Sequence, residues 1–122
     1  MIGKTTRPDN LPLYLCIFKL LQYFYLLIHN FPKEYKYTLG QSIMNLSWET
    51  LDLVILSNTL PNRDKGEIIH QVSVVFDRLK TRLRLAYELK LISHKKYTSI
   101  VEQNEEIGKM IAGWLHWANS QK

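Results

Sequence analysis

The sequence predicts an all-α protein, an antiparallel up-down-up-down four-helix bundle. Four segments of roughly 20 to 28 residues repeat apolar side chains at spacings of three and four, the period of an amphipathic helix. Breaks at Pro32, at Leu60-Pro61 and just before Ser93 separate these segments by short connections, which favour antiparallel neighbours. No segment alternates with a period of two, and no Asn-Gly or Asp-Gly hairpin signal occurs, so strands are not expected.

Size and composition indicate a single domain. The chain has 122 residues, of which 46% are hydrophobic and 22% charged, as in ordinary globular proteins. We expect residues 1–10 to form a flexible N-terminal tail and residues 11–122 to form one four-helix-bundle domain. The single cysteine, Cys16, cannot form an internal disulfide and lies in an apolar run. We therefore expect a buried, unreactive thiol and a cytoplasmic protein.

The first helix, from about Pro12 to Asn30, is the most apolar segment of the chain. Residues 11–31 approach the length needed to cross a bilayer, but a charge near the middle, Lys19, costs about 2.5–3.5 kcal/mol there. A polar stripe at helical spacing contains Lys19, Gln22, His29 and Lys33. We expect a helix of the bundle core and neither a membrane segment nor a signal peptide. Such an apolar helix has a surplus face to bury.

The remaining helices have recognisable ends. The second ends near Asn58, and two starts stay open, because Thr38-x-x-Gln41 fits a capping box whereas Pro32 fits an earlier start. The third begins after Asp64-x-x-Glu67, a plausible cap, and runs to about Leu91. Ser93 then caps the fourth helix after a very short turn.

Apolar side chains left over after the core is filled predict self-association. On the third helix the core face is centred near Leu83, and on the fourth a second apolar stripe runs beside the core face. The predicted oligomer interface contains Val74, Leu85, Leu89, Met110, Trp114 and Trp117. Gly108 and Gly113, inside the fourth helix, would let another helix backbone approach closely. The alternative is scattered surface hydrophobes, which are normal.

Positive charge is concentrated in one stretch. Residues 78–96 contain seven cations and one anion, Glu88, a net charge of +6, whereas the rest of the chain sums to −1 of the total of +5. We call the cations the basic collar: Arg78, Lys80, Arg82, Arg84, Lys90, Lys95 and Lys96. The first four form two helical-turn pairs that flank the core stripe on opposite sides. Such a surface suits phosphates of RNA or DNA, with little sequence selectivity. In the alternative, acids on other helices, such as Glu49 or Glu102, pair with these cations.

No pattern in the sequence predicts catalysis, a cofactor or a metal. Glu67-x-x-His70 has the spacing used in di-iron bundles, but that site needs a second copy and two more carboxylates. No paired His or Cys spacing suggests zinc, and no phosphate-cradling Gly-rich loop or Gly-x-Ser-x-Gly occurs. We expect a protein that is not an enzyme, has no small-molecule substrate and does not enter a membrane.

Three stretches carry a family resemblance that covers nearly the whole chain after residue 10. They are FPKEY followed by YTLGQ within residues 31–41, RLRLAYEL followed by LIS within residues 82–93, and IGKMIAGW at residues 107–114. With these the chain resembles the accessory variability determinant (Avd) proteins of diversity-generating retroelements. The wider four-helix-bundle family includes proteins encoded in intervening sequences of bacterial 23S ribosomal RNA.

The resemblance implies a homopentameric barrel of four-helix bundles. It also implies a non-catalytic accessory factor that binds the element's reverse transcriptase and the template RNA or its cDNA and supports mutagenic retrohoming. The contact with nucleic acid and polymerase carries over to Arg78, Lys80, Arg82 and Arg84, and less directly to Lys90, Lys95 and Lys96. The alternative function is that of a ribosome- or rRNA-associated structural bundle, like the intervening-sequence relatives.

Overall fold

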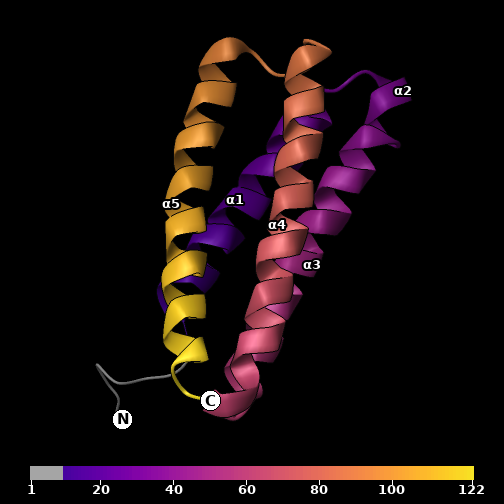
Figure 1. Cartoon of the computed structure of the whole chain (residues 1–122). Helices are drawn as coiled ribbons and strands as arrows, with labels where there is room; N and C mark the ends of the chain where they lie inside the picture. The colour runs from indigo at the N-terminus through magenta and orange to yellow at the C-terminus, as the bar shows by residue number, and fades with distance from the viewer. Residues whose placement is uncertain (1–9) are drawn as a thin grey trace.

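Four long antiparallel helices make up the protein, in a computed structural model that describes residues 10–122 (Figure 1). They are α1 (Leu11–His29), α3 (Leu39–Thr59), α4 (Lys65–Glu88) and α5 (His94–Asn119). A short helix, α2 (Lys33–Lys36), lies in the first connection, and a 3-10 turn, η1 (Asn62–Asp64), precedes α4. Across residues 10–122 there is no strand, which confirms the all-α bundle. The tail predicted for residues 1–10 lies, apart from Asn10, outside the described residues.

The helices alternate in direction and close into a ring of four neighbours. α3 packs on α1 and α4, α4 packs on α3 and α5, and α1 meets α5 along the least extensive of the four seams. Because each helix reverses the direction of the one before it, α2 and the α4–α5 turn lie at the same end of the bundle (Figure 1). The turn η1 and the end of α5 lie at the other end.

Side-chain caps start two of the helices. The Asn10 side chain accepts a hydrogen bond from the Leu13 amide at 3.1 Å, and the Asn10 amide donates to Oδ1 of Asn58 at 3.0 Å, which joins the start of α1 to the end of α3. Ser93 Oγ accepts from the Lys96 amide at 3.2 Å, which confirms the predicted cap of α5.

The other two predicted caps, Thr38 and Asp64, do stand at the N-cap positions of α3 and α4, but neither makes the predicted side-chain hydrogen bond. Thr38 Oγ1 donates back to the Glu34 carbonyl at 2.8 Å, because the turn of α2 places that carbonyl within reach, so no capping box forms with Gln41. Asp64 makes no side-chain cap hydrogen bond, since it belongs to η1 and enters α4 with helical backbone angles.

One contiguous apolar core joins all four long helices. Its largest fully buried side chains include Phe24 of α1, Phe76 of α4 and Ile107 of α5. Full burial of such a side chain contributes about 1.5–3 kcal/mol. Three buried hydroxyls of α3 donate to the carbonyl four residues earlier and so leave no buried donor without an acceptor: Ser47, Thr50 and Ser57.

Helix α1 contributes to this core but keeps a second apolar face outside it. Among residues 10–122 it is the one helix long and apolar enough to cross a membrane by length and composition. Seven of its nineteen residues are buried inside the bundle, and Lys19 is exposed. Cys16 is also exposed, so the prediction of a buried thiol was wrong, because Cys16 lies off the side of α1 that faces the core.

Gly40, in the first turn of α3, allows the α1–α3 connection to pack closely. A Cβ atom at this position would lie 2.7 Å from Cγ2 of Ile28 and 3.3 Å from the Tyr35 carbonyl oxygen. Gly113 of α5 differs, because no heavy atom of the described chain outside its own helical neighbourhood lies within 4 Å of the corresponding point. The two glycines therefore predict opposite responses to a methyl group.

We expect Gly40→Ala to lower the free energy of unfolding by about 1–2 kcal/mol, because overpacking outweighs the gain in helix propensity. Gly113→Ala, the matched control, should raise it by about 0.5–1 kcal/mol, since only propensity changes. Urea unfolding followed by circular dichroism at equal protein concentration measures both. Two changes of the same sign would contradict the packing at Gly40.

Candidate nucleic-acid interface

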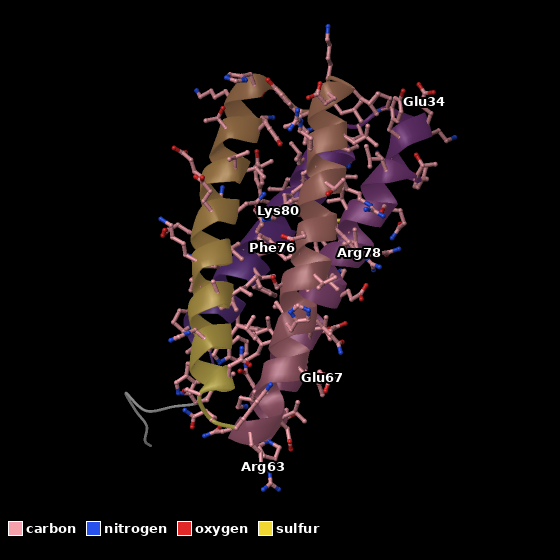
Figure 2. The ribbon with its side chains drawn as sticks, in the orientation of Figure 1. Glu34, Arg63, Glu67, Phe76, Arg78 and Lys80 are labelled. Carbon is pink, nitrogen blue, oxygen red and sulfur yellow. The ribbon has the colours of Figure 1, made fainter. Side chains whose placement is uncertain are left out.

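The first four cations of the basic collar lie on both flanks of α4. Arg78 and Arg84 are exposed, and Lys80 and Arg82 are half-buried. Figure 2 shows Lys80 on the side of α4 that faces α5 and Arg78 on the side that faces α3. The buried stripe of α4 lies between them, so cations border the contact of α4 with α3 and its contact with α5. The sequence predicts this placement on opposite sides of the core stripe.

Two cations of the collar have carboxylate partners, and both partners belong to α4 itself. Lys80 Nζ lies 3.0 Å from Asp77 and 5.3 Å from the centroid of the Phe76 ring. Arg84 Nε donates to Glu88 at 2.8 Å. This hydrogen bond, together with the Glu88 charge and the nearby Tyr97 and Tyr87, raises the pKa of Arg84. Both pairs are exposed, and such pairs contribute about 0–1 kcal/mol.

The other five cations of the collar make no ion pair with any carboxylate of residues 10–122: Arg78, Arg82, Lys90, Lys95 and Lys96. The acids that could have neutralised them from other helices, such as Glu49, Glu102 and Glu105, are exposed and likewise form no ion pair within the described chain. Most of the collar therefore faces solvent with its charge uncompensated.

Lys90 adopts a backbone conformation that favours glycine. Its φ of 64° is the one positive value among the non-glycine residues that the structure describes. The amide of Leu91 donates to Ala86 O, and that of Lys90 donates to Tyr87 O, both at 2.9 Å. This pair of bonds is a Schellman motif, in which the residue at Lys90 must be left-handed. A side chain there costs about 1 kcal/mol relative to glycine.

Lys95 and Lys96 also lie where local electrostatics disfavours a cation. They occupy the first turn of α5, which contains no acidic residue. The N-terminal end of a helix carries a partial positive charge, so a lysine there costs a few tenths of a kcal/mol where an acid would stabilise. Three lysines of this turn thus occupy positions that stability alone would give to other residues.

Two further cations lie at the same end of the bundle, and sequence reasoning missed them. Lys33 and Lys36 belong to α2, which shares this end with the α4–α5 turn (Figure 1). Lys33 is exposed and Lys36 is half-buried, with Glu34 between them as a partial offset. Their position could have been predicted from the sequence, because an up-down-up-down topology places the first and third connections at the same end of the bundle.

Aromatic side chains accompany the cations at the α4–α5 turn. The rings of Tyr87 and Tyr97 stack with centroids 4.2 Å apart and an interplanar angle of 7°. The Tyr87 hydroxyl lies 2.8 Å from Nδ1 of His94, within hydrogen-bond distance. Beside them is a cleft of about 350 Å³ lined by Tyr87, Glu88, Lys90, Ile92, Ser93 and His94. The sequence pattern alone did not place Tyr87 and Tyr97 in this surface.

The predicted oligomer interface divides into exposed and buried parts. Val74 and Leu85 of α4 and Leu89, which directly follows this helix, are exposed at 43%, 48% and 41%. On α5, Trp114 is buried in the core of the protomer, so its assignment to a surface was wrong, and Met110 and Trp117 are half-buried against the same core. The reason is helical phase, since α5 turns these side chains inward between its neighbours. No heavy atom of the described chain approaches within 4 Å of a Cβ built on Gly108, so no close helix contact accounts for this glycine within the protomer.

Most of the exposed large apolar side chains of residues 10–122 lie on α1 and α3. We call this surface the α1/α3 face: Leu11, Leu15, Phe18, Tyr25, Leu26, Trp48 and Ile55. The indole Nε1 of Trp48 donates to the Tyr25 hydroxyl at 2.9 Å, which joins the two helices on this face. Leu26 is 70% exposed. Of this surface, sequence reasoning identified only the surplus face of the first helix.

Within residues 10–122, no group of three or more His, Cys, Asp or Glu side chains is placed to hold a metal ion. Glu67 and His70, the residues of the Glu-x-x-His spacing, are exposed on α4.

A family model described as bAvd-like matches residues 16–118 of the chain. No curated protein and no solved structure gives a significant match. The matched segment includes the whole basic collar and all of α3 and α4.

The left-handed backbone at Lys90 predicts that Lys90→Gly raises the free energy of unfolding by about 1 kcal/mol, because the Cβ penalty disappears. Lys90→Ala keeps the Cβ and removes the charge, so it is the matched control and should leave stability nearly unchanged. Thermal and urea unfolding measure both variants. Equal stabilisation by glycine and alanine would mean that relief of charge repulsion, and not backbone strain, governs this position.

Proposed function

Since the chain belongs to the bAvd-like family, an accessory and non-catalytic type of protein, we propose that it serves a diversity-generating retroelement. In this function it binds the element's template RNA or cDNA and its reverse transcriptase, and it supports mutagenic retrohoming without supplying catalytic residues. The observation that carries the nucleic-acid part is the collar, in which five cations have no carboxylate partner within residues 10–122. Phosphates supply the missing negative charge.

The α3-facing flank of α4 supports a protein partner beside the nucleic acid. There, Arg78 and Arg82 lie on the same outer side of α4 as the exposed Leu85 and Leu89. Mixed apolar and arginine surfaces are typical of protein interfaces, in which arginine is enriched and lysine is depleted. We assign Leu85 and Leu89 to the reverse transcriptase, Arg78 and Arg82 to a surface that the enzyme shares with nucleic acid, and the turn with Lys90, Lys95 and Lys96 to nucleic acid alone.

We also propose that the protein is a homo-oligomer, a pentamer as the resemblance to Avd proteins implies, and that its subunits meet on the α1/α3 face. This face offers more exposed apolar side chains than any other surface of the described chain. Exposed patches of this kind mark interfaces. The apolar residues of α4 are less suited to a contact between subunits, because burying them would also bury Arg78 and Arg82, and a buried charge is costly unless a partner of different sequence supplies carboxylates.

Charge reversal tests the collar. The triple variant Arg78→Glu, Arg82→Glu, Arg84→Glu should bind RNA much more weakly, and the slope of log affinity against log salt should fall by about 2 in magnitude, about 0.7 for each lost phosphate contact. Fluorescence anisotropy with a labelled RNA at several salt concentrations measures both quantities. A variant with glutamine at the same three positions removes the charges without reversing them. It provides the test if the glutamate variant does not fold.

The matched control reverses three exposed cations outside the collar: Arg63, Lys109 and Lys122. Arg63 lies at the opposite end of the bundle (Figure 2). This control has the same net charge as the triple variant, so it separates a local contact from a general effect of charge. Equal loss of affinity in both variants would rule out the collar as the site.

For the oligomer, we expect Leu26→Glu to yield monomers in multi-angle light scattering, because a carboxylate cannot be buried unpaired in an apolar interface. Leu85→Glu on α4 is the matched control and should leave the assembly unchanged. If Leu85→Glu dissociates the assembly and Leu26→Glu does not, subunits meet on α4, as the sequence alone predicted.

Genomic context and partner capture separate the proposed function from the rRNA-associated alternative. A neighbouring reverse transcriptase gene with a repeat pair, and co-purification with that enzyme, would support the retroelement. A position within a ribosomal RNA operon, with binding to ribosomal RNA alone, would favour the alternative.

A further inference from the structure

The α4–α5 turn combines a series of aromatic rings, a cleft and lysines without ion pairs. A surface that binds only charge would not need the rings or the cleft. The rings of His94, Tyr87 and Tyr97 follow one another, with centroids 5.9 Å and then 4.2 Å apart. His94 is exposed, and the two tyrosines are half-buried. The cleft beside Tyr87 and His94 has a volume at the lower end of the range for small-molecule sites, which suits one flat base.

Cations outnumber acids around this cleft, since its one acidic lining residue, Glu88, is paired with Arg84. Lys90 lines the cleft, and Lys95 and Lys96 follow His94 in the first turn of α5. None of these lysines makes an ion pair within residues 10–122. Arg84 donates to Glu88, which also lines the cleft, so its guanidinium group lies close to this site. Guanidinium planes, like aromatic rings, stack on unpaired bases.

The Tyr87–His94 contact holds the turn in place. The hydrogen bond of 2.8 Å joins the last turn of α4 to the first residue of α5, and the Tyr87–Tyr97 stack joins the same two helices one turn further along α5. The rings are therefore fixed before any ligand arrives, which lowers the entropy lost on binding. Stacking on such rings contributes substantially for each base and tolerates any sequence.

We propose that this turn is a stacking site for an unpaired base of single-stranded RNA or DNA, with His94 and Tyr87 beside the base and Lys90, Lys95 and Lys96 on the neighbouring phosphates. The inference rests on the proposed nucleic-acid function and specifies single-stranded RNA or DNA as the ligand. A duplex keeps its bases stacked inside, so it engages the lysines without the rings. The protein therefore prefers single strands to duplexes of equal charge.

The experiment compares an unstructured oligouridine RNA with a duplex RNA that presents the same number of phosphates. Fluorescence anisotropy on the full chain gives the affinity for each. His94→Ala and Tyr87→Leu should weaken binding of the single strand by at least about 5-fold and leave duplex binding unchanged. The double variant Lys95→Gln, Lys96→Gln should weaken binding of the single strand and of the duplex to a similar extent.

Tyr87→Phe is the conservative control, because it keeps the ring and removes only the hydroxyl. It should retain most of the single-strand preference, and thermal unfolding identifies any variant that has lost its fold. His94→Ala, at an exposed position, keeps the test valid where Tyr87→Leu unfolds.

If the wild-type protein binds both RNAs equally and the ring variants change neither affinity, the site binds charge alone; the stacking site is then refuted and the proposed function stands. If the wild-type protein binds neither RNA, the proposed nucleic-acid function itself fails.

Discussion

Short connections force each long helix to run antiparallel to the one before it, and the grouping of cations at one end of the bundle follows from this constraint. The α1–α3 connection and the α4–α5 turn lie at the same end of the bundle, so Lys33 and Lys36 join the cations around Ser93 although some sixty residues separate them. The same alternation places α4 between α3 and α5. Cations on the two flanks of α4 consequently border two different seams, and one helix can present a different surface to each of two partners.

Three lysines of the α4–α5 turn occupy positions that lower the stability of the fold, and binding of an anion at this turn would explain all three. A left-handed lysine at position 90 and two lysines at the positive end of α5 each weaken the fold by a small amount. Natural sequences usually agree with their structure at every level, and local conflicts concentrate at functional sites. An anion bound at this turn would reverse the sign of the electrostatic part, because it would meet both the lysines and the helix N-terminus. The turn is therefore better suited to the bound state than to the isolated protein.

Helical periodicity was sufficient to predict the bundle, because burial of apolar stripes decides the fold of a chain with this pattern. It was insufficient where a result depends on a few tens of degrees of helical phase. Trp114 repeats with the core positions and also neighbours a second stripe, and only the packing of α5 shows that it is buried. Cys16 lies among apolar residues yet is exposed, since α1 is apolar on more than one side. The collar was predictable as a charge excess, but Asp77, directly before the counted stretch, pairs with Lys80. A count of charges within residues 78–96 therefore omits an acid that lies one helical turn away from a counted lysine.

The two principal surfaces differ in chemistry and in position, and this difference has a consequence for affinity. The α1/α3 face is apolar and the collar is cationic, with α1 and α4 on opposite corners of the four-helix ring. Assembly through the first surface, as proposed, would leave the second uncovered in every subunit. Each collar has five cations without an ion pair within residues 10–122, so a single copy would bind a polyanion weakly and would lose it readily as salt rises. When several collars are held in one assembly, a strand bound to one copy meets the next at a high effective concentration, and the total affinity exceeds that of any single site by orders of magnitude. A long template strand would then remain bound while each individual contact stays weak enough to release a segment as it is copied.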